Sequence, residues 1–150
     1  MTSTPDIILI VDDDPTTCAL TTTVLEREGY RTRSCTNGPD ALDLVATSPV
    51  SLVLLDVVMP GMDGFEVCAR LRATEAGKRL PIILLTGRDD VDTRIEGIQS
   101  GVSEFLAKPV TRHELVARVR AQLHILDLTR QLERVEEALR NTAPSTAPAS

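Results

Sequence analysis

The feature that most constrains the fold is an uninterrupted apolar run, residues 52–55, that ends at Asp56. Such a run predicts a strand that is covered on both faces, as in a parallel sheet between two layers of helices. Pro60 and Gly61 then predict a turn, and Asp63 predicts the cap of a following helix. Asp56 is therefore expected at the carboxyl edge of the sheet, where open α/β folds place their chemistry, although a lone carboxylate there could equally be a turn or cap residue.

The same order of strand and then helix occurs five times. Pro15 after Asp14 and the Thr111-x-x-Glu114 capping box are strong helix starts. The repeated pattern predicts an α/β fold, with a doubly wound parallel sheet and right-handed crossovers. The strands are expected at 6–11, 30–35, 52–56, 80–86 and 102–107. The helices are expected at 15–28, from 37–40, at 64–73, from 87–90 to 100, and from 111 onward. The inner residues expected for the first helix are Cys18, Leu20 or Thr21, Val24 and Leu25, and those for the weaker fourth helix are Ile95 and Ile98.

Composition narrows the class of protein. With 42% apolar residues but two Phe, one Tyr and no Trp, the core must be aliphatic. No apolar run approaches the roughly 18 residues that span a membrane, and the first residues do not resemble an export signal. Three widely spaced cysteines suit reduced thiols, so a cytoplasmic location is expected. The net charge of −6 argues against a nucleic-acid surface on this chain.

The last helix is longer than the sheet needs. Its first part offers apolar residues that can pack on the sheet: Leu115, Val116, Val119, Leu123 and Leu126. A second apolar stripe then continues at steps of three and four, which predicts a coiled-coil seam for a dimer or a partner, or else a frayed amphipathic extension. This seam consists of Ile125, Leu128, Leu132, Val135 and Leu139. We therefore expect a domain at 1–126, a helical extension at 127–140 and a disordered tail at 141–150.

Polar residues end four of the predicted strands. Because parallel strands share one carboxyl edge, Asp12, Asp13, Asp56, Thr86 and Lys108 are expected in one crevice. Three neighbouring carboxylates repel one another and need a cation, and an all-oxygen site suits Mg²⁺. Lys108 and the Thr86 hydroxyl could bind phosphoryl oxygens. The set thus predicts phosphoryl transfer onto Asp56.

These motifs resemble one family, the receiver domain of two-component response regulators. The matching segments are Ile-Leu-Ile-Val-Asp-Asp-Asp-Pro at 8–15, Leu-Leu-Asp-Val-Val-Met-Pro-Gly-Met-Asp-Gly at 54–64, Ile-Ile-Leu-Leu-Thr-Gly at 82–87 and Phe-Leu-Ala-Lys-Pro at 105–109. They occur in the family's order and spacing between about residues 6 and 126. The resemblance implies a flavodoxin-like sheet with strand order 2-1-3-4-5.

The resemblance also implies roles for the residues of the crevice. Asp56 would be the phosphoacceptor, Asp13 a direct Mg²⁺ ligand, Asp12 a ligand acting largely through water, and the Val58 backbone carbonyl a further ligand. Residues from two other strands complete the family pattern. Thr86 and Lys108 would contact the phosphoryl group, Phe105 would be an aromatic switch that turns inward with Thr86, and the Lys108–Pro109 bond would be cis. Plain core packing is the alternative for Phe105.

The expected function is a signalling module that takes phosphate from a histidine kinase or a phosphotransfer protein and catalyses only its own phosphorylation and dephosphorylation. It would act through a protein partner or a dimer, or it would be a fragment joined to an effector such as a cyclase or kinase. An Asp-nucleophile phosphohydrolase is disfavoured, because Val58 stands where a general acid would be needed. A nucleotide switch is disfavoured by the absence of a phosphate-binding glycine loop.

Overall fold

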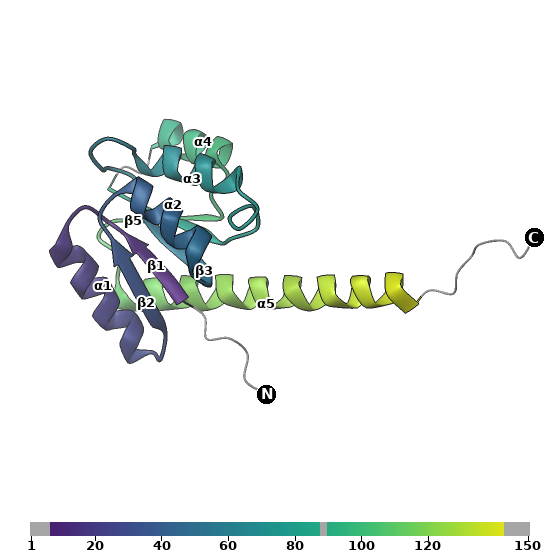
Figure 1. The fold of residues 1–150 in the computed structure, drawn as a ribbon. Helices are drawn as coiled ribbons and strands as arrows, with labels where there is room; N and C mark the ends of the chain where they lie inside the picture. The colour runs from purple at the N-terminus through teal and green to yellow at the C-terminus, as the bar shows by residue number, and fades with distance from the viewer. Residues whose placement is uncertain (1–6, 88–89, 143–150) are drawn as a thin grey trace, which may run out of the picture.

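A computed structural model describes residues 7–87 and 90–142 of the chain. Five strands and five helices alternate along these residues (Figure 1). The strands are β1 (Ile7–Val11), β2 (Arg31–Cys35), β3 (Val50–Asp56), β4 (Ile82–Thr86) and β5 (Glu104–Ala107). The helices are α1 (Pro15–Arg27), α2 (Gly38–Thr47), α3 (Gly64–Arg72), α4 (Val91–Ser100) and α5 (Arg112–Thr142).

The strands form one parallel sheet in the order β2-β1-β3-β4-β5, which confirms the predicted fold class and strand order. β4 and β5 each begin two residues later than expected. For β4 the reason is Pro81, which has no N–H to give to a strand ladder. Its carbonyl still accepts a hydrogen bond from the Val53 N–H, at 2.9 Å.

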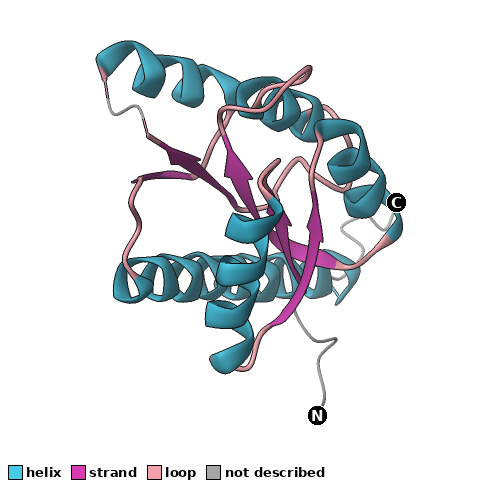
Figure 2. Ribbon diagram, turned by 90° about the vertical axis from the view of Figure 1, so that its left-hand side faces the viewer, coloured by secondary structure: helices cyan, strands magenta, loops and turns pink. Residues whose placement is uncertain are grey.

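Side chains of the buried strands alternate between two cores. Leu9, Val53 and Leu84 pack on the side of α2 and α3, whereas Ile8, Leu52 and Ile83 pack on the side of α1 and α5. The helices accordingly cover both faces of the sheet, as Figures 1 and 2 show. An uninterrupted apolar strand is what this double burial requires, because every side chain of such a strand meets a helix.

Two helices present different residues to the sheet than their apolar spacing predicts. In α1, Leu20 is 65% exposed while Leu25 is fully buried. In α4, Ile95 and Ile98 are 47% and 70% exposed, and the buried residues are Thr93 and Gly97. The predictions for Leu20, Ile95 and Ile98 were therefore wrong, and Thr21, the alternative to Leu20, is half-buried. For α4 the physical reason is that its inner side is made of small residues, which admit close packing but carry no hydrophobic signal.

Helix α5 extends well beyond the body of the domain (Figure 1). The five apolar residues expected on the sheet are all buried. Each of the five seam residues, in contrast, is at least half exposed. Leu126 is buried, and Leu128 lies two residues further on, about 200° around the helix, so the seam points away from the body. The helix ends at Thr142, two residues into the predicted tail; 143–150 lie outside the described residues. Within the described ranges, no helix is long and apolar enough to cross a membrane.

Gly64 allows α3 to start directly against the end of β3. Its N–H donates to the Val57 carbonyl at 2.9 Å. A Cβ on residue 64 would overlap the Asp56 carbonyl oxygen and lie 2.9 Å from the Cα of Val57. Because both obstacles are backbone atoms, no side-chain movement can make room for the added carbon.

Replacing Gly64 with Ala should therefore lower the free energy of unfolding by about 2 kcal/mol, the range typical of overpacking in a rigid site. Urea unfolding followed by circular dichroism measures this change. Gly87→Ala is the matched control, since a Cβ at residue 87 meets nothing within 4 Å. Equal stability of the two variants would contradict the close-approach argument.

Candidate functional site

Three carboxylates meet at the carboxyl edge of the sheet. Asp12 and Asp13 follow β1, and Asp56 is the last residue of β3. Their ligand oxygens lie within 4.8 Å of one another. Asp12 and Asp56 are 3% and 6% exposed, whereas Asp13 is exposed to solvent. The arrangement follows from the register, which pairs Val11 with Leu55 and so brings the ends of both strands side by side.

Lys108 provides the positive charge of the site. Its Nζ lies 3.1 Å from Asp56 Oδ1 and 3.7 Å from Asp12 Oδ2. The residue follows β5, and its N–H donates to the Thr86 carbonyl at 2.8 Å, which fixes where the side chain leaves the backbone. The Lys108–Pro109 peptide bond is cis, as predicted.

The Asp12 carboxylate is only partly satisfied. Oδ1 accepts a hydrogen bond from the Asp14 N–H at 2.9 Å, but buried Oδ2 has no hydrogen-bond partner. Burial raises the pKa of the Asp12 carboxyl, and the negative charges of Asp56 and Asp13 raise it further. The hydrogen bond from the Asp14 N–H and the positive charge of Lys108 lower this pKa, but by less. A buried carboxylate oxygen that accepts no hydrogen bond, beside two more carboxylates, is a good ligand for a hard cation, so these residues fit Mg²⁺.

Thr86 and Phe105 lie on the last two strands of the sheet, β4 and β5. Thr86 is 2% exposed at the end of β4, one residue beyond Leu85, which pairs with Asp56. Phe105 is half-buried in β5, beside Leu84 of β4. Thr86 thus comes from the strand next to that of Asp56, and Phe105 comes from the strand after it in the sheet.

The remaining predicted residues have simpler surroundings. Asp14 caps α1: its Oδ1 accepts from the Thr16 N–H at 3.1 Å, which confirms the cap. The Val58 side chain is 63% exposed beside the site, and the role of its carbonyl stays a prediction. The seam of α5 is not part of this crevice, since it lies on the far side of that helix from the sheet.

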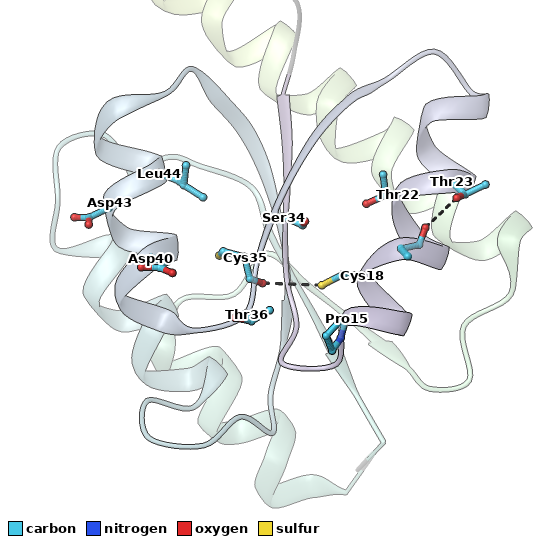
Figure 3. Close-up of a pocket in the computed structure, with 11 residues that line it drawn as sticks. Pro15, Cys18, Thr22, Thr23, Ser34, Cys35, Thr36, Asp40, Asp43 and Leu44 are labelled. Atoms are coloured by element: carbon cyan, nitrogen blue, oxygen red, sulfur yellow. Dashed lines mark hydrogen bonds between the residues drawn. The ribbon is translucent and has the colours of Figure 1, made fainter.

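A large hollow of about 850 Å³ lies elsewhere, between α1, β2 and α2 (Figure 3). Cys18 and Cys35 line it, and the Cys18 thiol donates to the Asp12 carbonyl at 3.3 Å. Burial raises the pKa of the Cys18 thiol, and raises that of Cys35 to about 11. Both thiols are therefore protonated near neutral pH and are poor nucleophiles, as expected for structural cysteines.

Sequence reasoning missed the glycines that shape the site. Gly64 was noticed only as part of a motif, yet it determines how closely the loop after β3 approaches Asp56. The sequence did hold one sign of this role. Gly64 directly follows the helix cap Asp63, where the backbone conformation does not require a glycine. A glycine there indicates close backbone approach.

The geometry of the site agrees with the proteins that this chain resembles. A family model described as the response regulator receiver domain matches residues 8–120. The transcriptional regulatory protein AfsQ1 of Streptomyces coelicolor is 45% identical over 120 residues, which cover 79% of this chain and 51% of that protein. The chain therefore spans about half the length of this curated relative.

Solved structures agree with the family model. A crystal structure described as that of a response regulator from Chloroflexus aurantiacus has a TM-score of 0.76 and 37% identity, and the match covers 81% of this chain and 99% of that one. The receiver domain of the sensor histidine kinase PA1611 from Pseudomonas aeruginosa, solved with magnesium in its active-site cleft, has a TM-score of 0.75 and 30% identity, with the same coverage.

The burial of the Asp12 carboxyl leads to a prediction about how stability depends on pH. Since the folded state holds the Asp12 proton more tightly than the unfolded chain does, ionisation costs stability as the pH rises above the ordinary value of 3.8. Asp12→Asn carries no such proton. In EDTA, its advantage over the parent should therefore grow as the pH rises through Asp12's titration range, level off once Asp12 is ionised in both states, and reach on the order of 1 kcal/mol.

Urea titrations at pH 4 to 8, with EDTA or with Mg²⁺, measure this difference. Mg²⁺ should stabilise the parent more than Asp12→Asn, because it binds the folded site. Asp43→Asn makes the same chemical change at an exposed residue and should show neither effect. A constant difference between Asp12→Asn and the parent across the pH range would contradict the account.

Proposed function

The chain belongs to the family of response regulator receiver domains, and we propose that its Asp56 accepts a phosphoryl group from a phosphohistidine donor. The observation that carries this proposal is the position of Asp56: it is buried at the end of β3, 3.1 Å from Lys108 Nζ and grouped with two other carboxylates. The Lys108 ammonium pairs with this carboxylate, and a carboxylate is the nucleophile that phosphoryl transfer onto an aspartate needs.

In the proposed reaction a carboxylate oxygen of Asp56 attacks phosphorus, and the bond from phosphorus to the donor imidazole nitrogen breaks. Lys108 Nζ, which pairs with Asp56 beforehand, moves its contact to a phosphoryl oxygen as negative charge is transferred there. The Thr86 hydroxyl donates to another oxygen. The burial of Thr86 and Asp56 keeps bulk water from the acyl phosphate that results.

Asp13, Asp56 and the Val58 carbonyl would hold Mg²⁺, with Asp12 acting largely through water. The ion supplies charge neutralisation at the phosphoryl oxygens. Two observations support this ligand set: the Oδ2 of Asp12, which accepts no hydrogen bond, and the magnesium in the cleft of the similar receiver of PA1611.

The donor is proposed to be a histidine kinase or a histidine phosphotransfer protein. A groove of about 580 Å³ lies beside Lys108, between α1 and the start of α5. Leu20, Val24 and Pro109 line it, and Leu20 is largely exposed. This apolar surface next to the phosphoacceptor suits the docking of a helical donor, and explains why Leu20 need not be buried in its own domain.

For the output, we propose that the seam of α5 pairs with a second copy of the chain. The extension is fixed to the body on its other side, where Arg79 forms an ion pair with Glu133 and Leu126 is buried. Glu136 and Gln131 flank the apolar stripe, so two parallel copies would not place like charges opposite each other. A downstream effector domain such as a cyclase or kinase is the second candidate, since the chain spans about half the length of AfsQ1.

We further propose that the chain turns over no external substrate and works in the cytoplasm. Its three cysteines are free thiols, which suit a reducing compartment. The phosphohydrolase alternative loses support because exposed Val58 provides no general acid near Asp56.

Incubation with acetyl phosphate and Mg²⁺ should add one phosphoryl group to the parent chain, as measured by intact-protein mass spectrometry. Asp56→Asn should take up none, because the amide is not a nucleophile. Asp43→Asn should be labelled like the parent, because its carboxylate is remote from the site. Labelling of Asp56→Asn at the parent level would rule out this acceptor.

Light scattering after size-exclusion chromatography tests the seam. Leu132→Glu should shift a dimer to a monomer, because it places a charge in the middle of the apolar stripe. Asn141→Glu introduces the same charge on the same helix away from the stripe and should leave the dimer intact. A dimer that persists in Leu132→Glu would assign the contact to another surface.

A further inference from the structure

Gly38 begins α2, and the loop that follows β3 packs against it. A Cβ on residue 38 would lie 2.7 Å from Sδ of Met62 and 2.8 Å from Cγ2 of Val67. Gly38 is buried, and its φ is not positive, so backbone conformation does not account for the glycine. The glycine instead leaves the space in which the Met62 side chain lies against the start of the helix.

The loop joins β3 to α3 and includes Val58, whose carbonyl is the proposed metal ligand. Backbone hydrogen bonds fix its two ends: the Val57 N–H donates to the Leu85 carbonyl at 3.1 Å, and the Gly64 N–H donates to the Val57 carbonyl at 2.9 Å. Between these ends Met59 is buried, whereas Val58 is 63% exposed. The position of the Val58 carbonyl therefore depends on how the rest of the loop is packed.

We propose that Gly38 is a positioning residue for the metal site: by admitting Met62, it holds the loop on α2 and so keeps the Val58 carbonyl in place. The proposal rests on the phosphoacceptor function argued above, which includes that ligand. The three carboxylates either end a strand or directly follow one. Val58 belongs to the loop instead, so its carbonyl is the proposed ligand that depends most on a contact with another element.

An added methyl group at residue 38 must displace one of its neighbours. Val67 is fully buried in α3 and is β-branched, so its side chain is held in place. Met62 is half-buried and unbranched, so it can move outward. Because Cβ of Met62 would lie only 3.1 Å from the new carbon, the loop itself must shift by a few tenths of an ångström.

Such a shift affects two cations differently. Mg²⁺ requires near-ideal octahedral geometry at short distances, whereas Ca²⁺ accepts a variable number of oxygen ligands in flexible arrangements. A displaced carbonyl should therefore weaken the binding of Mg²⁺ more than that of Ca²⁺. A general loss of stability would not discriminate between the two ions.

The test follows the Val58–Met59 peptide group by nuclear magnetic resonance. The sequence contains one Val–Met pair, so ¹³C-carbonyl valine and ¹⁵N-methionine label this single peptide. In metal-free Gly38→Ala its resonance should differ from that of the parent, because the loop has moved. Titration should then give an affinity for Mg²⁺ that is about tenfold lower, a loss typical of groups that orient metal ligands, and a smaller loss for Ca²⁺.

Gly77→Ala is the matched control for a crowded glycine. A Cβ on residue 77 would overlap the Leu71 carbonyl oxygen, but Gly77 lies beyond the C-terminal end of α3, at the opposite edge of the sheet from the site. This variant should lose stability and bind Mg²⁺ like the parent. In a Met62→Ala background, Gly38→Ala should cost less affinity, because Sδ, the closest atom, is absent.

The proposal is overturned if Gly38→Ala binds Mg²⁺ like the parent, if both ions weaken by the same factor, or if the Met62→Ala background does not reduce the loss. An equal loss in Gly77→Ala would overturn it as well, because lower stability would then explain the effect. Failure of the parent itself to bind Mg²⁺ would instead overturn the proposed metal site. In that case the metal-free resonance alone decides whether Gly38 sets the position of the loop.

Discussion

Repulsion among three carboxylates is the constraint that the rest of the structure must satisfy. Asp12, Asp13 and Asp56 are brought within 4.8 Å of one another by two adjacent parallel strands, and two of them are buried. Such a group is stable only with positive charge close by. Lys108 supplies one such charge from the end of β5, and the Asp12 oxygen that accepts no hydrogen bond leaves a place for a second. The site therefore has excess negative charge, and binding of a cation would reduce the repulsion among its carboxylates.

The fold holds these groups together despite their repulsion. β1, and β3 from Ser51 onward, are buried between two helix layers, so their ends cannot separate without exposing both cores. Gly64 adds a second restraint by bringing the start of α3 onto the backbone of β3. Cys18 adds a third, through its hydrogen bond to the Asp12 carbonyl. The hydrophobic effect on the strands thus provides the free energy that keeps an unfavourable charge cluster in place.

Most of the fold and the membership of the crevice could be predicted, because both depend on local signals. Apolar runs identify buried strands, and the common edge of parallel strands places Asp12, Asp56, Thr86 and Lys108 together without any knowledge of side-chain packing. What failed was the choice of helix face. Leu20, Ile95 and Ile98 have apolar spacing but point outward. The roles of Gly64 and Gly97 were missed for a related reason. Each glycine makes room for atoms from another element of the chain, and the neighbours of a residue in sequence do not reveal such a contact.

The outward apolar residues of α4 bear on how a signal could leave the site. Among the described residues of α4, those facing inward are Thr93 and Gly97, so the helix buries little apolar surface, and shifting it costs little hydrophobic free energy. Helix α5 differs: five apolar residues are buried, and Glu28 pairs with both Arg112 and Arg120. Phe105, for which a switch role is predicted, contacts this helix at Gly97. Helix α5, which carries the seam, stays attached to the sheet. A partner that contacts both helices could therefore detect a displacement of α4 relative to α5.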